Sequence, residues 1–220
     1  MENKQFDPQS IDGLFYNPWI GENYSQNKVL IVGDSFYFNE DNEDDEWVFS
    51  KDAPSGMVKN QGLNSEEFPT RKLFNAIEKV FYNRVLTYDE RNKMWQNVAY
   101  WNLTQRPMNS RLDRPSDEDF KMGWNAFLNL AEIIKPKLVI KLAYDGTGIL
   151  GGILHNENNG WDYNPDQFYI KPYKIDISKG DTSFTLLIIY HPTGSRGFIN
   201  NDWNEFLNTN ASGLIESLLK

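Results

Sequence analysis

Four short apolar segments constrain the fold of this chain more than any other feature of its sequence. Each is a nearly unbroken apolar run, rich in β-branched side chains, without the alternation that a half-exposed strand has. Such runs are typical of strands that are covered on both faces, as in a parallel sheet flanked by helices. The segments predicted to be strands are 29–32, 98–101, 138–140 and 184–190.

Helical patterns occupy the sequence between and after these segments. Apolar residues at helical spacing follow Pro69 and predict a helix over 69–81. Ser116 and Asp119 form the pattern of a capping box, and the apolar stripe after them stops at Pro136. Two further patterns predict helices over 147–154 and 203–218.

The alternation of strands and helices predicts an α/β fold. We expect a three-layer αβα sandwich with a central four-stranded, mainly parallel sheet. The 220 residues contain no repeat and no linker, so we interpret 1–220 as one domain with 1–27 as an N-terminal extension.

Composition excludes several kinds of site. The chain has no cysteine, which removes disulfides, thiol nucleophiles and thiolate metal sites, and we expect neither a metal nor a cofactor. Its first residues are polar and acidic and no run is long enough to span a bilayer, so we expect a cytoplasmic monomer without membrane contact.

The formal net charge of −9 bears on possible partners. An acidic surface repels nucleic acid on average, so DNA binding requires a local basic face. The arginines available for such a face are Arg106, Arg111, Arg114 and Arg196. The acidic segment 40–46 would act against it, since like charges repel a phosphate backbone.

Polar side chains follow the predicted strands at the point where each strand ends. Gly33, Asp34 and Ser35 follow the first, Asn102 ends the second, and His191 follows the fourth. Ligands of α/β sheets bind at the carboxyl ends of the strands, so these residues are the candidate functional site.

These residues and their order resemble the uracil-DNA glycosylase superfamily. The loop Gly33-Asp34-Ser35-Phe36-Tyr37 is similar to the family's first loop, Asn102 to its base-reading Asn, and His191-Pro192-Thr193 to its His-Pro-Ser element. The resemblance implies the family's fold and cleavage of the N-glycosidic bond of uracil or a related damaged base. The implied partner is single- or double-stranded DNA, in base excision repair.

The resemblance also implies roles for individual residues. His191 would donate to the uracil oxygen as negative charge develops, and Asn102 would pair with the uracil edge. The family's water-positioning Asp or Asn falls on Ser35, so Asp34, one residue earlier, is the candidate for the acidic role. Gly33, Phe36 and Tyr37 would line the base pocket, and Thr193, Ser195 and Arg196 would contact DNA. One of Phe36, Phe38 or Phe49 would stack on the base, although core packing explains each of these rings equally well.

Two other interpretations remain open. Val32-Gly33-Asp34-Ser35 is also similar to the Gly-Asp-Ser opening of the SGNH hydrolases, which would make Ser35 a nucleophile and His191 its base. The Asp that this family places three residues before its His is Ile188 here. The third interpretation is a member of the glycosylase fold that binds a nucleotide or partner without catalysis.

Overall fold

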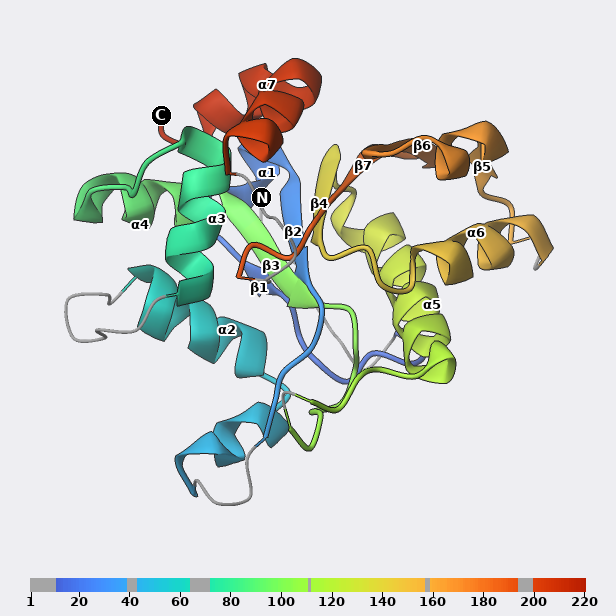
Figure 1. Cartoon of the computed structure of the whole chain (residues 1–220), viewed down its shortest axis with the longest axis horizontal. Coiled ribbons are helices and arrows are strands. Elements are labelled where there is room, and N and C mark those ends of the chain that lie inside the picture. Colours follow the sequence, from blue (N-terminus) through green and yellow to red (C-terminus); the bar gives the residue numbers. More distant parts are fainter. Residues whose placement is uncertain (1–10, 39–42, 64–71, 111, 157–158, 194–199) are drawn as a thin grey trace.

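The fold is built on one mixed sheet. A computed structural model of the chain describes residues 11–38, 43–63, 72–110, 112–156, 159–193 and 200–220. Within these residues the sheet has seven strands in the order β1-β3-β2-β4-β7-β6-β5 (Figure 1). The strands are β1 (Trp19–Ile20), β2 (Val29–Gly33), β3 (Val98–Asn102), β4 (Leu138–Leu142), β5 (Asp162–Tyr163), β6 (Tyr173–Lys179) and β7 (Thr182–Ile189).

The four predicted strands form the centre of this sheet. They are β2, β3, β4 and β7, and the pairs β2–β3, β2–β4 and β4–β7 are all parallel. The prediction of a four-stranded sheet is wrong in width, because β1, β6 and β5 extend it through antiparallel pairs. Strand β6 alternates buried and exposed residues, so a search for continuous apolar runs does not detect it.

Helices cover both faces of the sheet (Figure 1). Helices α3, α4 and α7 lie over one face, and α5 and α6 lie over the other. The helices are α1 (Tyr24–Asn27), α2 (Ala53–Met57), α3 (Lys72–Tyr82), α4 (Tyr88–Gln96), α5 (Asp117–Ile134), α6 (Thr147–Asn156) and α7 (Asn200–Ser217). The described residues also contain three short helical segments, η2 (Glu43–Phe49), η3 (Val58–Leu63) and η4 (Pro165–Tyr169).

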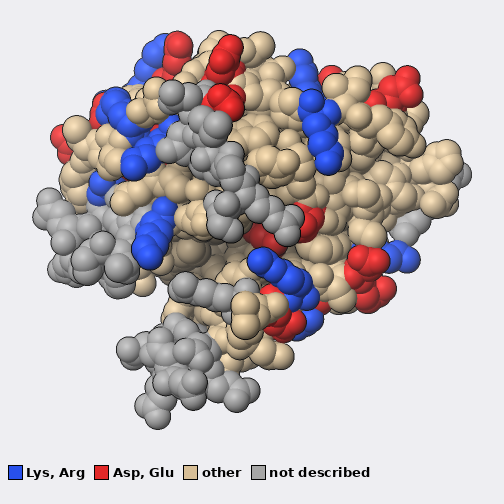
Figure 2. Space-filling model, viewed as in Figure 1, with Lys and Arg blue, Asp and Glu red and all other residues tan. Residues whose placement is uncertain are grey.

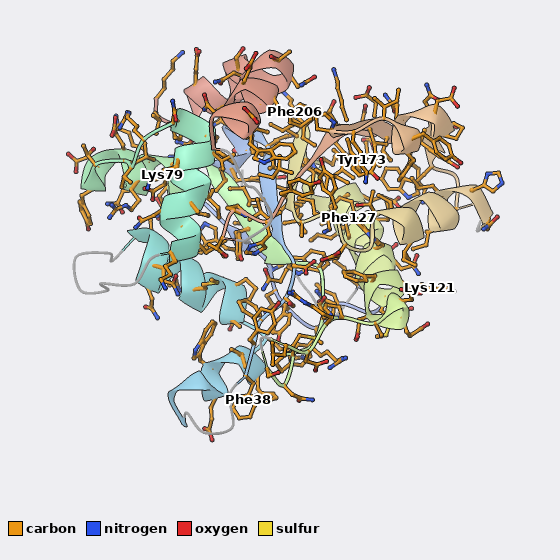
Figure 3. All side chains as sticks on the ribbon, in the orientation of Figure 1. Phe38, Lys79, Lys121, Phe127, Tyr173 and Phe206 are labelled. Atoms are coloured by element: carbon orange, nitrogen blue, oxygen red, sulfur yellow. The ribbon has the colours of Figure 1, made fainter. Side chains whose placement is uncertain are left out.

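Each face of the sheet has its own hydrophobic core. Alternate residues of each strand point to opposite faces, so Leu30 and Val32 pack toward α5 while Val29 and Ile31 pack toward α3. Figure 3 labels Phe127, which is buried between α5 and the sheet, and Lys121, which is exposed on the same helix. The continuous apolar strands therefore form because both faces are covered.

The helix signals in the sequence agree with the structure. The Ser116–Asp119 capping box is present, and α5 ends at Ile134, ahead of Pro136. The helix predicted over 69–81 is α3, which begins at Lys72 within the described residues. The C-terminal helix α7 is interrupted at Ala211, whose backbone is not helical.

The segment that we set apart as an N-terminal extension contributes to the domain. From residue 11 onward it contains β1, which pairs with β3, and Tyr16, whose side chain is fully buried. The Tyr16 hydroxyl donates to the Val48 carbonyl at 2.7 Å, and Trp101 donates from its ring nitrogen to the Tyr16 carbonyl at 2.8 Å.

Candidate functional site

The candidate site lies at the carboxyl edge of the four parallel strands. Gly33 pairs with Asn102 in register, so the ends of β2 and β3 are side by side. Backbone pairing continues beyond both strands: Leu103 N donates to Gly33 O at 3.0 Å and Thr104 N donates to Asp34 O at 2.9 Å. These bonds fix the backbone of the loop after β2 at Gly33 and Asp34, the first two candidate site residues.

Asn102 is held against the backbone of Gly33. A Cβ atom at Gly33 would lie 2.1 Å from Asn102 Oδ1, so this position requires glycine for the side chain of Asn102 to fit. The Tyr100 hydroxyl donates to the same Oδ1 at 3.0 Å. Burial raises the pKa of the Tyr100 phenol, so this hydroxyl keeps its proton and remains a donor. Tyr100 thus fixes the orientation of the Asn102 amide.

Asp34 forms a buried ion pair with a lysine that the sequence analysis did not select. Asp34 is 7% exposed, and its Oδ1 lies 3.6 Å from the Nζ of Lys141, which is completely buried in β4. Lys141 Nζ also donates to the Ala143 carbonyl at 2.7 Å. Ala143 has a φ of 130°, an uncommon conformation for a residue other than glycine. The sequence did contain a signal for this residue: Lys141 is a charged residue in an apolar strand that is covered on both faces. A lysine buried in this way requires a partner for its charge.

His191 is half-buried behind the end of β7. The backbone N–H of Thr193 donates to His191 Nδ1 at 3.3 Å, and Thr193 Oγ1 lies 3.1 Å from the same nitrogen. A donor at Nδ1 assigns the ring proton to Nε2. Burial lowers the pKa of His191, which favours a neutral imidazole with one N–H group available to donate.

The charged groups at this edge act on one another. Burial raises the pKa of Asp34, while Lys141 and His191 lower it and Asp145 raises it further. Burial lowers the pKa of Lys141, which Asp34 and Asp145 raise. The pKa of His191 is in turn raised by Asp34 and lowered by Lys141 and Arg114. The structure therefore brings Asp34, His191 and Lys141 within electrostatic reach.

The two halves of the site come from opposite faces of the sheet. Asn102 shares the α3 face with Tyr100, whereas Lys141 shares the α5 face with Val139. Strands β3 and β7 are separated by β2 and β4, a distance of about 14 Å at ordinary strand spacing. A ligand that contacts both Asn102 and His191 would lie across the ends of β2 and β4.

The structure does not pair Ser35 with His191. Ser35 Oγ is buried without a hydrogen-bond partner among the described residues, and His191 Nδ1 is engaged by Thr193. Asp34 Oδ1 and Thr104 Oγ1 are likewise buried without hydrogen-bond partners in that part of the chain. Unsatisfied polar atoms of this kind are costly unless something binds them.

The aromatic residues after β2 are arranged mainly as packing groups. Phe36 is 4% exposed and forms edge contacts with Tyr16 and Trp47. Phe38 packs against Phe49, beside η2 (Figure 3). Tyr37 is half-buried, and its hydroxyl accepts a long hydrogen bond of 3.5 Å from Arg114.

The residues proposed to contact DNA are only partly described. Thr193 is exposed beside His191, whereas Ser195, Arg196 and Arg111 lie outside the described residues. Arg106 forms two hydrogen bonds with Asp119, at 2.7 and 2.8 Å. Arg114 is therefore the described arginine that faces the site.

Charge on the surface is mixed. The face drawn in Figure 2 carries acidic and basic side chains interspersed, without a continuous basic area. The acidic segment 40–46 lies outside the described residues at 40–42, and its remainder is in η2. Any DNA contact at this site would therefore depend on a few local cations.

A separate open hollow of about 430 Å³ lies beside η2 and α2. None of the strand-end side chains lines it, and its charged groups are one carboxylate and one ammonium group. We therefore locate the candidate site at the strand ends, where buried polar groups converge. The hollow is lined by Trp47, Ser50, Asp52, Ala53, Ser55, Gly56 and Lys59.

Within the described part of the chain, no three His, Asp or Glu residues are grouped so that they could hold a metal ion. No helix there combines the length and apolar character needed to cross a bilayer. No protein-family model matches the chain, and no curated protein matches it.

Proposed function

We propose that this protein hydrolyses the N-glycosidic bond of uracil or a related damaged base in DNA, on a fold of the uracil-DNA glycosylase type. The observation that carries the proposal is the position of Asp34, Asn102 and His191 at the carboxyl ends of three parallel strands. The same residues carry the resemblance to that superfamily in the sequence.

The chemistry of the reaction suits these groups. Departure of the base leaves positive charge on the sugar and negative charge on the base, so fixed charges and donors in a dry site lower the barrier. The buried carboxylate of Asp34 would stabilise the sugar cation and orient the attacking water. His191, with its proton at Nε2, would donate to the oxygen of the departing base.

Asn102 accounts for base selection in this proposal. Its carbonyl accepts the N3–H group of uracil and its amide donates to O4, whereas cytosine presents the opposite pattern. A mismatched pair would leave buried polar groups without partners, at a cost of about 1–3 kcal/mol each. The hydrogen bond from Tyr100 keeps the amide in one orientation, which such a selection requires.

The test is release of base from oligonucleotides that contain one deoxyuridine, as single strands and as duplexes. We expect release by the wild-type protein from uracil-containing DNA, and none from matched strands that contain cytosine or thymine. A base flipped from a duplex must first leave the stack, so release from single strands should be at least as fast. No release from any of a panel of uracil, hypoxanthine and alkylated bases would reject the proposal.

Two neighbouring substitutions separate this proposal from an acyl hydrolase. Asp34→Asn should lower single-turnover base release by about a hundredfold or more, since it removes charge stabilisation in the transition state. Ser35→Ala is the matched control one residue away, and it should retain most of the activity. Hydrolysis of a nitrophenyl ester that Ser35→Ala abolishes would instead identify Ser35 as a nucleophile.

A further inference from the structure

We propose that Lys141 is a positioning residue for Asp34: its buried ammonium group holds the Asp34 carboxyl group in its anionic form and in one orientation at the candidate site. The catalytic part of this proposal rests on the function proposed above, whereas the ion pair does not.

The ion pair is buried at the edge of the sheet. Lys141 is fully buried, with Val32 and Ile188 beside it on the neighbouring strands. Its Nζ has two polar neighbours in the described residues, the Ala143 carbonyl at 2.7 Å and Asp34 Oδ1 at 3.6 Å. Asp34 Oδ1 has no hydrogen bond of its own there, so Lys141 provides its nearest compensating charge.

Burial makes the charged form of Asp34 depend on a nearby cation. A carboxylate in an apolar environment is strongly disfavoured unless a cation or donors stabilise it, and otherwise it takes up a proton. The other charged groups that act on Asp34 are Asp145, in the loop after β4, and His191, in the loop after β7. Asp145 disfavours the anion, and His191 favours it less strongly than Lys141 does, so Lys141 is the main cation acting on Asp34.

Lys141 need not touch the substrate. Its side chain lies within the sheet below Asp34 and has no exposed surface. It can therefore influence a bound substrate only through the Asp34 carboxylate. The backbone also supports this arrangement, because the Ala143 carbonyl that accepts from Lys141 belongs to a residue with an unusual φ of 130°. Such conformations persist where the surrounding structure holds them.

The activity test compares pH profiles of base release under single-turnover conditions. In Lys141→Met, we expect the midpoint of the acid limb to move upward by about one pH unit or more, because Asp34 loses its counter-ion. Above the new midpoint the rate should return to within a few fold of wild type. Lys179→Met is the matched control, since Lys179 forms a partly exposed pair with Glu132 away from the strand ends, and its profile should match the wild type. An unshifted midpoint, or an equal loss of rate at every pH, would overturn the proposal.

A second test does not depend on activity. Urea unfolding of Lys141→Met should show stability that falls as the pH rises from 5 to 8, because an unpaired carboxylate must ionise in the core. Adding Asp34→Asn should remove this pH dependence and restore stability. If Lys141→Met does not fold but the double variant does, the proposal is supported. A double variant that is equally unstable or unfolded would overturn it, because Lys141 would then be needed for reasons unrelated to Asp34.

The two tests distinguish the proposals from each other. A wild-type protein without base release, combined with restored stability in the double variant, rejects the glycosylase function and retains the ion pair. Active wild-type protein with no difference between Lys141→Met and Lys179→Met in either measurement rejects the role of Lys141 alone.

Discussion

Replacing Gly33 with alanine would disturb the contact between β2 and the Asn102 side chain. The new Cβ would lie 2.1 Å from Asn102 Oδ1 and 2.7 Å from the Tyr100 hydroxyl, both far closer than a carbon–oxygen contact allows. Asn102 would have to move by about an ångström and lose its hydrogen bond from Tyr100. Overpacking and a buried unpaired hydroxyl together predict a destabilisation of about 2–5 kcal/mol.

Urea unfolding measures this effect as a lower midpoint at an unchanged m-value. The control is Gly152→Ala in α6, where a Cβ would meet nothing within 4 Å. This change should stabilise the protein by about 0.5–1 kcal/mol through helix propensity. In an Asn102→Ala background, the cost of Gly33→Ala should fall by at least half. A Gly33→Ala variant within about 0.5 kcal/mol of wild type would refute the close approach.

Three further outcomes are expected. Tyr100→Phe should cost about 1–3 kcal/mol, because Asn102 Oδ1 loses its buried donor; uracil should also be selected over cytosine less strictly, as measured by competing base release. Ser116→Ala removes the acceptor for the backbone N–H of Asp119 at the start of α5 and should cost about 1 kcal/mol in urea unfolding. For His191, whose pKa is lowered by burial, the unfolded chain binds the proton more readily. Stability should therefore fall as the pH drops below about 6.5, and His191→Asn should remove this part of the pH dependence.

The central strands were predictable from the sequence because one physical cause dominates them. Residues such as Val29 and Ile31 are buried on one face while Leu30 and Val32 are buried on the other, and an unbroken apolar run is the direct result. Strand β6 has the exposed Asp176 between the buried Ile175 and Ile177, so its alternating pattern gives a weaker apolar signal. Strand β1 has only two residues and forms by pairing with β3. The local sequence around β1 contains no pattern that predicts this pairing.

The candidate site was only partly predictable for a related reason. Strand ends can be read from the sequence, so Asp34, Asn102 and His191 were selected before their positions were known. Lys141 and Tyr100 lie within strands, and their importance follows from neighbours on other strands. Phe36 follows a strand end but packs into the core against Tyr16. No local pattern in the sequence indicates that these two residues are in contact.

The short antiparallel strands at the two margins of the sheet affect the solubility of the protein. Each margin ends in a strand of two residues, β1 beside β3 and β5 beside β6. A long apolar strand with unpaired backbone groups is a template on which another chain can add, and short outer strands limit that risk. A chain that began at residue 28 would lose β1 and leave β3 with an open margin. Such a protein should aggregate through β3 even where its two cores remain folded, so we expect residues 11–27 to limit self-association as well as to contribute to the domain.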